Sequence, residues 1–215
     1  MKAAELTDTG TVEVVERDRP TPKADQVVVR VGACGVCMTD YHMYSGSLTV
    51  DLPMTPGHES AGEVVAVGAE TDRYEPGDRV AINPTVSCGA CPACKAGHEN
   101  LCENLTSIGG AADTILDGAF AEYVSVPASK LERIGDMAYE EAAFAEPLGC
   151  CIHGVDRIDL TSGETVAVVG AGPIGLLLVQ YLRSIGAGEI VVSELVEGRR
   201  EAALELGADH VVNPE

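Results

Sequence analysis

The sequence contains no tryptophan, only two phenylalanines and only four lysines among its 215 residues. Lys and Arg together number 14 against 34 Asp and Glu, which gives a formal net charge of −20. Nucleic acids and anionic membranes both reward clustered basic side chains, so neither is an expected partner. No apolar run approaches the ~20 residues of a membrane span, and residues 1–5 lack the apolar core of a signal peptide. We therefore expect a cytoplasmic protein.

The acidity is distributed along the whole chain and does not form a tail. Hydrophobic residues make up 46% of the sequence, which argues against disorder, because chains that cannot fold combine high charge with low hydrophobicity. A charge of this size lies far outside the roughly 2–8 units typical of a small soluble domain. Concentrated salt would screen the self-repulsion, so we expect a halophile's protein, with an ordinary acidic enzyme as the alternative.

Four of the eight cysteines lie close together in the sequence, at Cys88, Cys91, Cys94 and Cys102. Two residues between neighbouring thiolates let a tight turn direct both sulfurs at one ion. Four thiolates close a tetrahedral shell with no open position, which is typical of a structural zinc. A pair of disulfides and an iron–sulfur cluster are the alternatives. We expect this zinc in a surface lobe at 83–106.

The first part of the chain is β-rich, with short Val-rich runs separated by Gly and Pro. The expected strands are 11–15, 26–31, 63–67, 79–82 and 119–126. Many short strands of this kind indicate a small barrel or sandwich. From about residue 140 the pattern becomes helical, and then alternates strand and helix. The expected βαβαβ elements are 165–170, 173–185, 189–193, 197–206 and 210–212, which predicts a parallel sheet.

A glycine-rich turn connects the first two of these alternating elements, and residues 170–175 read Gly-Ala-Gly-Pro-Ile-Gly. Gly170 permits a tight turn, Gly172 lets a pyrophosphate approach the backbone, and Gly175 allows close packing of helix on strand. The pyrophosphate would lie at the helix N-terminus, where N–H groups point outward, so Pro173 and Ile174 also belong to the expected site. Glycines that serve only a turn are the alternative.

Glu194 follows the second strand of the alternating part, nineteen residues beyond Gly175. Its carboxylate would accept hydrogen bonds from a ribose 2′-hydroxyl and would repel a 2′-phosphate. We therefore expect NAD as the cofactor. Arg199 and Arg200 keep NADP as the minority alternative.

A second metal site is predicted from two short segments about twenty residues apart. With a nucleotide-binding pattern downstream, Cys37 and His58 are candidate ligands of a catalytic zinc, which takes three protein ligands and keeps one position open. Glu59 and Glu146 are the candidates for the third ligand. Asp40 is a candidate acceptor for the other nitrogen of His58.

At this point the sequence resembles the zinc-dependent medium-chain alcohol and polyol dehydrogenases, over its whole length. The Glu-Pro-Leu segment resembles the sorbitol dehydrogenase branch in particular. The motifs that carry the resemblance are CMTDYH at 37–42, GHESAGEV at 57–64, GDRV at 77–80, the four-cysteine lobe, EPL at 146–148 and the glycine turn.

The resemblance implies an α/β plus β fold, with a GroES-like barrel at 1–155 and a Rossmann NAD-binding domain at 156–215. Only the first half of a Rossmann sheet is present, so the resemblance also implies a truncated chain with an exposed sheet edge. It implies a homodimer or homotetramer at full length. It further implies two Zn²⁺ per chain, one catalytic and one structural.

Carried onto this chain, the resemblance makes Cys37, His58 and Glu146 the catalytic zinc ligands, while Glu59 exchanges with Glu146 or holds the metal's water. The implied reaction is hydride transfer between a polyol or secondary alcohol and NAD, and a threonine-type dehydrogenase is an alternative. In the corresponding mechanism the substrate's hydroxyl proton passes to Thr39 and then toward His42 and solvent. For Thr39 the alternative is a helix N-cap, and for His42 a surface histidine.

Two other readings remain open. A zinc-scaffolded binding module would explain the lobe but not the glycine turn, and a zinc-free reductase would not need Cys37 with His58. Cys34 is expected to be a buried neutral thiol rather than part of a redox motif. Cys150 and Cys151 are expected in the core. His98, His153 and His210 show no partner pattern.

Overall fold

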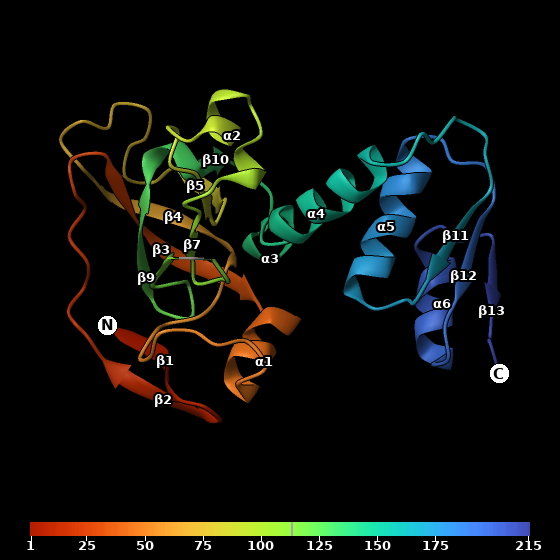
Figure 1. Cartoon of the computed structure of the whole chain (residues 1–215), viewed down its shortest axis with the longest axis horizontal. Helices are drawn as coiled ribbons and strands as arrows, with labels where there is room; N and C mark the ends of the chain where they lie inside the picture. The colour runs from red at the N-terminus through yellow and green to blue at the C-terminus, as the bar shows by residue number, and fades with distance from the viewer. Residues whose placement is uncertain (113) are drawn as a thin grey trace. The chain divides into compact units, whose positions relative to one another are not determined.

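The computed structural model describes residues 1–112 and 114–215, and the chain forms two compact units, Met1–Glu146 and Pro147–Glu215 (Figure 1). Helix α4 (Ala145–Asp156) begins at the end of the first unit and continues into the second. The domain boundary predicted between residues 155 and 156 stays a prediction. Among the described residues, no helix is both long enough and apolar enough to cross a membrane.

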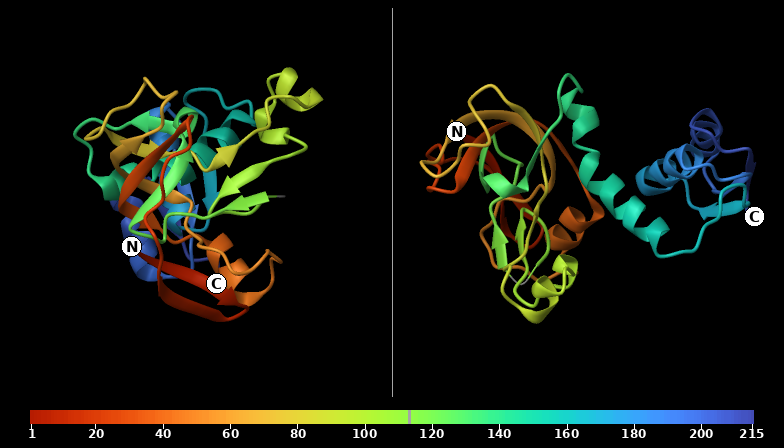
Figure 2. Two further views of the ribbon diagram at one scale, coloured as in Figure 1. Left: turned by 90° about the vertical axis from the view of Figure 1, so that its left-hand side faces the viewer. Right: turned by 90° about the horizontal axis from the view of Figure 1, so that it is seen from above.

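The first unit is built around an antiparallel five-stranded sheet that curls about its core (Figure 2). Its strands, in spatial order, are β10 (Leu131–Arg133), β5 (Arg79–Ile82), β4 (Glu59–Val67), β3 (Gln26–Gly35) and β9 (Tyr123–Pro127). Two smaller sheets accompany it. They contain β1 (Lys2–Asp8), β2 (Thr11–Glu16), β6 (Thr85–Val86), β7 (Thr106–Ile108) and β8 (Thr114–Leu116).

The inner face of this sheet carries the core of the first unit. Val27, Val29, Val64, Val80 and Leu131 are each fully buried in one cluster. Branched side chains suit the pleated surface, and their burial removes apolar area from water. Short helices lie around the sheet: α1 (Met38–Ser45), α2 (Pro92–Lys95) and α3 (Tyr139–Ala142), with 3₁₀ turns at Glu99–Leu101 and Ala128–Lys130.

The barrel expectation is confirmed, but the strands differ in several respects. β6, β7, β8 and β10 were not expected, because each is only two or three residues long and carries no extended strand pattern. β1 was not expected, because its alternation of Ala, Glu and Leu carries little strand propensity. β9 begins at Tyr123 rather than at 119, because the amides of Ala119 and Phe120 donate to the carbonyls of Gly57 and Pro56 instead of a sheet neighbour. β3 runs on to Gly35 and β4 starts as early as Glu59.

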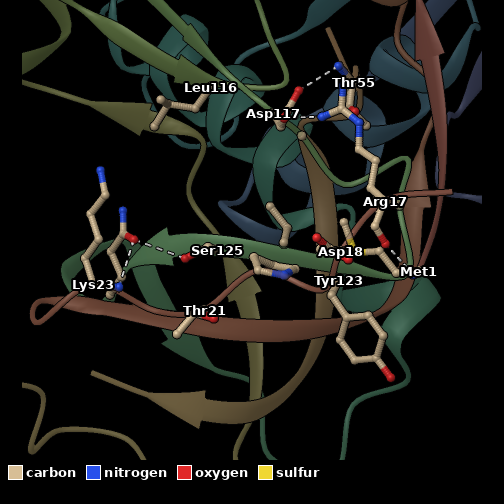
Figure 3. A pocket seen from close by; sticks show the side chains of 15 residues that line it. Met1, Arg17, Asp18, Thr21, Lys23, Thr55, Leu116, Asp117, Tyr123 and Ser125 are labelled. Atoms are coloured by element: carbon tan, nitrogen blue, oxygen red, sulfur yellow. Dashed lines mark hydrogen bonds and ion pairs between the residues drawn. The ribbon is translucent and has the colours of Figure 1, made fainter. Parts of the chain in front are cut away.

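Contacts remote in sequence hold the β1–β2 hairpin to the unit. Arg17 forms an ion pair with the buried Glu5. Arg17 also pairs with Asp117, whose carboxylate accepts the amide of Thr55 at 2.9 Å (Figure 3). Leu6 is buried against Met54. The hairpin is therefore placed by tertiary contacts that local propensity does not reveal.

The second unit has the predicted alternation: β11 (Val166–Val169), α5 (Pro173–Ser184), β12 (Ile190–Ser193), α6 (Glu197–Glu205) and β13 (His210–Val212). The three strands pair in parallel in the order β11-β12-β13. α5 packs on β11 and β12, and α6 on β12 and β13 (Figure 1). The core includes the fully buried Val179, Ile190 and Val192. The expectation of a half Rossmann sheet is confirmed.

The expectation for the adjacent cysteines of α4 is half wrong. Cys151 is buried and its thiol donates to the carbonyl of Ile174 at 3.7 Å, whereas Cys150 is exposed. Successive helical residues point about 100° apart, so an amphipathic helix cannot bury both neighbours on one narrow face.

Candidate functional site

Helix α1 starts immediately beside the first predicted metal ligand. Cys37 is its N-cap residue, and the Asp40 carboxylate accepts the Cys37 amide at 2.8 Å, which closes a capping contact. Thr39 therefore lies inside the first turn and is not the N-cap, so that alternative for Thr39 is wrong. The thiol of Cys37 donates to the hydroxyl of Thr39 at 3.6 Å.

His58 and Glu59 lie where the chain enters β4. Gly57, directly before them, has a φ of +97°, and a Cβ there would lie 2.7 Å from the amide nitrogen of Phe120. Only glycine accommodates both the left-handed backbone and this close approach. The turn brings ligand atoms of Cys37, His58 and Glu59 within 4.8 Å of one another.

The buried ring of His58 faces Asp40. His58 Nδ1 lies 3.7 Å from Asp40 Oδ1, and both atoms are buried without a hydrogen-bond partner in the part of the chain that the structure describes. Burial raises the pKa of the Asp40 carboxyl, although the Cys37 amide counteracts the shift. A proton on Nδ1 directed at Asp40 leaves Nε2 as the nitrogen with a lone pair.

These residues fit a metal of the zinc type. One thiol, one imidazole and one carboxylate form a three-ligand set that leaves a coordination position open. The unpartnered Asp40–His58 pair matches the way a carboxylate orients a metal-binding histidine. A buried polar pair that lacks partners is costly unless a further group completes it.

The two other residues discussed for this site are placed differently. Glu146 is the second residue of α4 and is half-buried. It does not belong to the cluster of Cys37, His58 and Glu59, whose ligand atoms lie within 4.8 Å of one another. Burial, and next the charge of Asp40, raises the pKa of the Cys34 thiol to about 12. Cys34 is half-buried rather than buried as expected, and the raised pKa keeps it a neutral thiol at ordinary pH and a poor metal ligand.

The predicted proton path lies along one helix. His42 is three residues beyond Thr39 on α1, and residues at this spacing share a helix face. Thr39 is half-buried and His42 is exposed. Thr39 therefore lies next to the ligand set, and His42 lies further along the helix in solvent.

The cysteine-rich lobe brings its four sulfurs together. All four are thiols rather than disulfides, and their ligand atoms lie within 4.8 Å of one another. The Sγ atoms of Cys91 and Cys94 are 3.4 Å apart and those of Cys88 and Cys94 are 4.0 Å apart. A tetrahedral shell with Zn–S bonds of ~2.3 Å separates its sulfurs by about 3.8 Å, so the lobe fits a four-thiolate zinc.

Backbone amides surround these sulfurs. The amide of Cys91 donates to Cys88 Sγ at 3.4 Å, and the amide of Cys88 donates to Cys102 Sγ at 3.2 Å. Amide donors from Ala90 and Cys91 lower the pKa of Cys88 to about 6. Donors that stabilise thiolates are a feature of metal lobes, and they disfavour the disulfide alternative.

The glycine turn in the second unit has the expected geometry. Gly170 has a φ of +94°, and a Cβ at Gly175 would lie 2.0 Å from the carbonyl oxygen of Gly170. Gly172, the N-cap of α5, has open space where a side chain would be, and Pro173 and Ile174 begin the helix. The twelve-residue helix therefore presents an unobstructed N-terminus, which suits an anion such as a pyrophosphate.

Glu194 lies against this turn. Its Oε2 accepts the amide of Ala171 at 2.8 Å and its Oε1 accepts the amide of Val196 at 2.9 Å. These amides, Val196 first, hold the pKa of the Glu194 carboxyl below its usual range. Each carboxylate oxygen keeps a further lone pair. Glu194 can therefore hold these two amides and still accept a hydrogen bond from a ligand hydroxyl.

The two arginines after Glu194 differ in orientation. Arg200 donates to the carbonyls of Glu194 at 2.8 Å and Leu195 at 2.6 Å, whereas Arg199 is exposed. Arg200 is thus directed at the backbone of the turn, and Arg199 is the guanidinium available to a bound group.

One hollow and three histidines lie outside the two cysteine-containing clusters and the glycine turn. A hollow of about 330 Å³ beside the hairpin is lined by Met1, Lys23 and Tyr123 among others, and mixes basic with acidic groups (Figure 3). His210 lies 3.9 Å from Glu189 on an exposed strand. His98 and His153 belong to neither of the two metal-type clusters found among the described residues.

The barrel, the lobe and the glycine turn together define the fold class of the medium-chain dehydrogenases. Residues 23–136 match the family model described as alcohol dehydrogenase GroES-like domain, and residues 173–215 match the model described as zinc-binding dehydrogenase. The chain belongs to this zinc-binding alcohol dehydrogenase family.

Relatives and solved structures agree with this assignment. A sorbitol dehydrogenase of Bacillus subtilis is 40% identical over 99% of this chain and 61% of its own length. An L-threonine 3-dehydrogenase of Caldanaerobacter subterraneus is 38% identical over 94% of this chain and 58% of its own. The crystal structure of a zinc-binding dehydrogenase from Sinorhizobium meliloti, bound to NADP, has a TM-score of 0.95 at 42% identity, covering 99% and 61% of the two chains. The chain thus spans about 60% of the length of these proteins.

Proposed function

We propose that this protein takes part in zinc-dependent hydride transfer between a polyol or secondary alcohol and NAD. The observation that carries the proposal is the convergence of Cys37, His58 and Glu59, backed by Asp40. The reaction needs a metal site and a cofactor site. The first unit holds the ligand set, and the second unit holds the glycine turn. A zinc-scaffolded module without catalysis would need only the four-cysteine lobe.

In this proposal Cys37, His58 and Glu59 hold a zinc, with Glu146 as the alternative carboxylate. The bound metal would supply Lewis-acid polarisation of a substrate hydroxyl, and NAD would supply the hydride acceptor. Thr39 Oγ1, close to Cys37, accepts the substrate's hydroxyl proton as its own hydroxyl proton passes on to His42. His42 then carries the proton to solvent, as imidazole is suited to general base work near neutrality.

Cys88, Cys91, Cys94 and Cys102 hold a second zinc, which leaves no position for substrate. We therefore propose two Zn²⁺ per chain with separate roles. The lobe zinc stabilises the loop, and the metal at Cys37 takes part in the reaction.

We propose NAD rather than NADP on the arrangement around Glu194. Its carboxylate lies at the glycine turn, where it favours a ribose hydroxyl and repels a 2′-phosphate. Arg200 is directed at two backbone carbonyls, so Arg199 alone offers a cation to such a phosphate. The related structure from Sinorhizobium meliloti is bound to NADP, so the test compares both cofactors.

The cofactor choice is tested by binding NAD and NADP to the wild type and to Glu194→Ser, with Glu197→Ser as a matched exposed control. We expect the wild type to bind NAD more tightly than NADP. In Glu194→Ser the ratio of the NADP to the NAD dissociation constant should fall at least about tenfold, which corresponds to ~1.4 kcal/mol. In Glu197→Ser this ratio should match that of the wild type. Unchanged preference in Glu194→Ser would remove the proposed role of this carboxylate.

The substrate is tested with a panel of polyols, secondary alcohols and L-threonine at high salt. Oxidation of polyols and secondary alcohols in preference to L-threonine supports the proposal. Preference for L-threonine would favour the threonine-type alternative, for which the relative from Caldanaerobacter subterraneus is the support.

We also propose that the protein works in a concentrated-salt cytoplasm, as a homodimer or homotetramer. The net charge of −20 supports the first point, because salt screens like-charge repulsion. The melting temperature should rise steadily as KCl is added from low to molar concentration. A melting temperature that does not respond to KCl would contradict the halophilic proposal.

A further inference from the structure

The last rung of the β3–β4 pairing lies directly beside the proposed catalytic metal ligands. Gly35 pairs with Glu59 in this antiparallel ladder. Cys37 follows Gly35 by two residues, and His58 precedes Glu59 by one. Side chains that face each other across such a rung have Cβ atoms only ~4.5–5.5 Å apart, so residue 35 controls the space available to Glu59.

The Glu59 side chain occupies the space where any other residue at position 35 would place its Cβ. A Cβ built on Gly35 would lie 2.2 Å from Glu59 Oε2 and 3.2 Å from Glu59 Cβ. Gly35 is not among the glycines with positive φ, so the backbone conformation does not require glycine. The requirement at this position is therefore one of space for the carboxylate.

We propose that Gly35 is the positioning residue that lets the Glu59 carboxylate face Cys37 and His58. This inference rests on the metal site proposed above and specifies Glu59 as its third ligand. Gly35 acts through Glu59 and touches no reacting atom itself.

A second glycine lies close to another ligand. A Cβ at Gly110 would lie 3.3 Å from Cγ of His58 and 2.6 Å from Oγ of Ser107. Gly110 also lacks a positive φ. At Gly110 the absence of a side chain therefore mainly makes room for Ser107, and a Cβ there would also crowd the ring of His58.

The surroundings of Glu59 allow the test variant to fold. A hollow of about 160 Å³ is lined by Gly35, Glu59, Cys34 and Phe144 among others. An alanine methyl at position 35 would push the end of the flexible Glu59 side chain toward this space rather than move the backbone. Gly35→Ala is therefore expected to remove one ligand and leave the fold intact.

The experiment is a double-mutant cycle on the full 215-residue chain with Gly35→Ala, Glu59→Ala and the double variant. Gly154→Ala is the matched control, because nothing lies within 4 Å of a Cβ at that position and its φ is not positive. The readouts are the affinity of the Cys37 metal in a chelator competition and the visible spectrum after Co²⁺ substitution. Metal retained by the four-cysteine lobe reports that each variant is folded.

We expect Gly35→Ala to weaken the Cys37 metal by roughly 10–100-fold and to change its Co²⁺ spectrum toward that of Glu59→Ala, since residues that orient ligands have effects of this size. The substitution should have no further effect in the Glu59→Ala background, and Gly154→Ala should match the wild type. A wild-type spectrum and affinity in Gly35→Ala, with the metal bound, would overturn the inference and leave the proposed function standing. The inference would also be overturned if Gly35→Ala reduced the metal affinity of Glu59→Ala as much as it reduces that of the wild type. A wild-type chain that binds metal only in the lobe would overturn both.

Discussion

Nδ1 of His58 and Oδ1 of Asp40 face each other at 3.7 Å, both buried and both without a hydrogen-bond partner among the described residues. The other oxygen of Asp40 caps α1 by accepting the Cys37 amide. One carboxylate therefore contacts the backbone of one proposed ligand and the ring of another. This arrangement couples the start of α1 to the entry of β4.

Replacing Asp40 by Asn separates these two contacts. The Asn carbonyl can still accept the Cys37 amide, but its NH₂ group would face His58 and favour the wrong ring tautomer. We expect the affinity of the Cys37 metal to fall about 10–100-fold in a chelator competition, with the lobe metal unaffected. Asp51→Asn, at an exposed loop residue, is the control. Wild-type affinity in Asp40→Asn would show that Asp40 does not orient the histidine.

Glu194→Gln is expected to change the acid sensitivity of the second unit. Amides of Val196 and Ala171 lower the folded-state pKa of Glu194. A lowered folded pKa contributes stability above the unfolded value of about 4.3, and that stability is lost as the pH falls through the folded pKa. The variant should thus lose less stability than the wild type between pH 6 and pH 3. Thermal unfolding across this range tests it, with exposed Glu197→Gln as control, and parallel pH profiles of Glu194→Gln and wild type would refute it.

Cys91→Ser should release the lobe metal alone. Cys91 contributes one of four clustered sulfurs, and three remaining ligands no longer close the shell. Metal analysis should find one equivalent fewer, and the lobe should become sensitive to proteolysis. Cys150→Ser, outside both clusters, should keep the wild-type metal content. Simultaneous loss of the Cys37 metal in Cys91→Ser would mean that the two sites are not independent.

Leu131→Ala should destabilise the first unit by about 2–5 kcal/mol, because it removes a fully buried side chain from the main cluster and leaves a cavity. Leu101, which is 64% exposed, provides the control, and Leu101→Ala should change stability by less than ~0.5 kcal/mol. Denaturant unfolding of both variants measures the difference. Similar effects from the two substitutions would contradict the placement of the core.

The parts of the molecule that depend on local spacing could be predicted from the sequence. The Cys88–Cys102 cluster, the glycine turn and the alternation from β11 to β13 each lie within a short segment whose geometry follows from its residues. The family resemblance added the barrel, which composition alone left open between barrel and sandwich.

The parts that depend on register or remote contacts could not be predicted. The pairing of Gly35 with Glu59 follows from where β3 ends and β4 begins, and both strands run further than their Val-rich runs indicated. β1 is fixed by Arg17 and by packing of Leu6, which have no local signal. Cys150 and Cys151 lie in the same apolar helical stretch of the sequence, and the rotation of α4 alone decides which of them is buried.

The central claim is that Cys37 belongs to a metal site separate from the cysteine lobe. The most direct test is the zinc content per chain of the wild type and of Cys37→Ser, measured on folded protein by elemental analysis. We predict two zinc ions per wild-type chain and one in Cys37→Ser, with the remaining ion lost only when the lobe is also mutated. Two zinc ions retained in Cys37→Ser, or a single lobe-bound ion in the wild type, would contradict the claim.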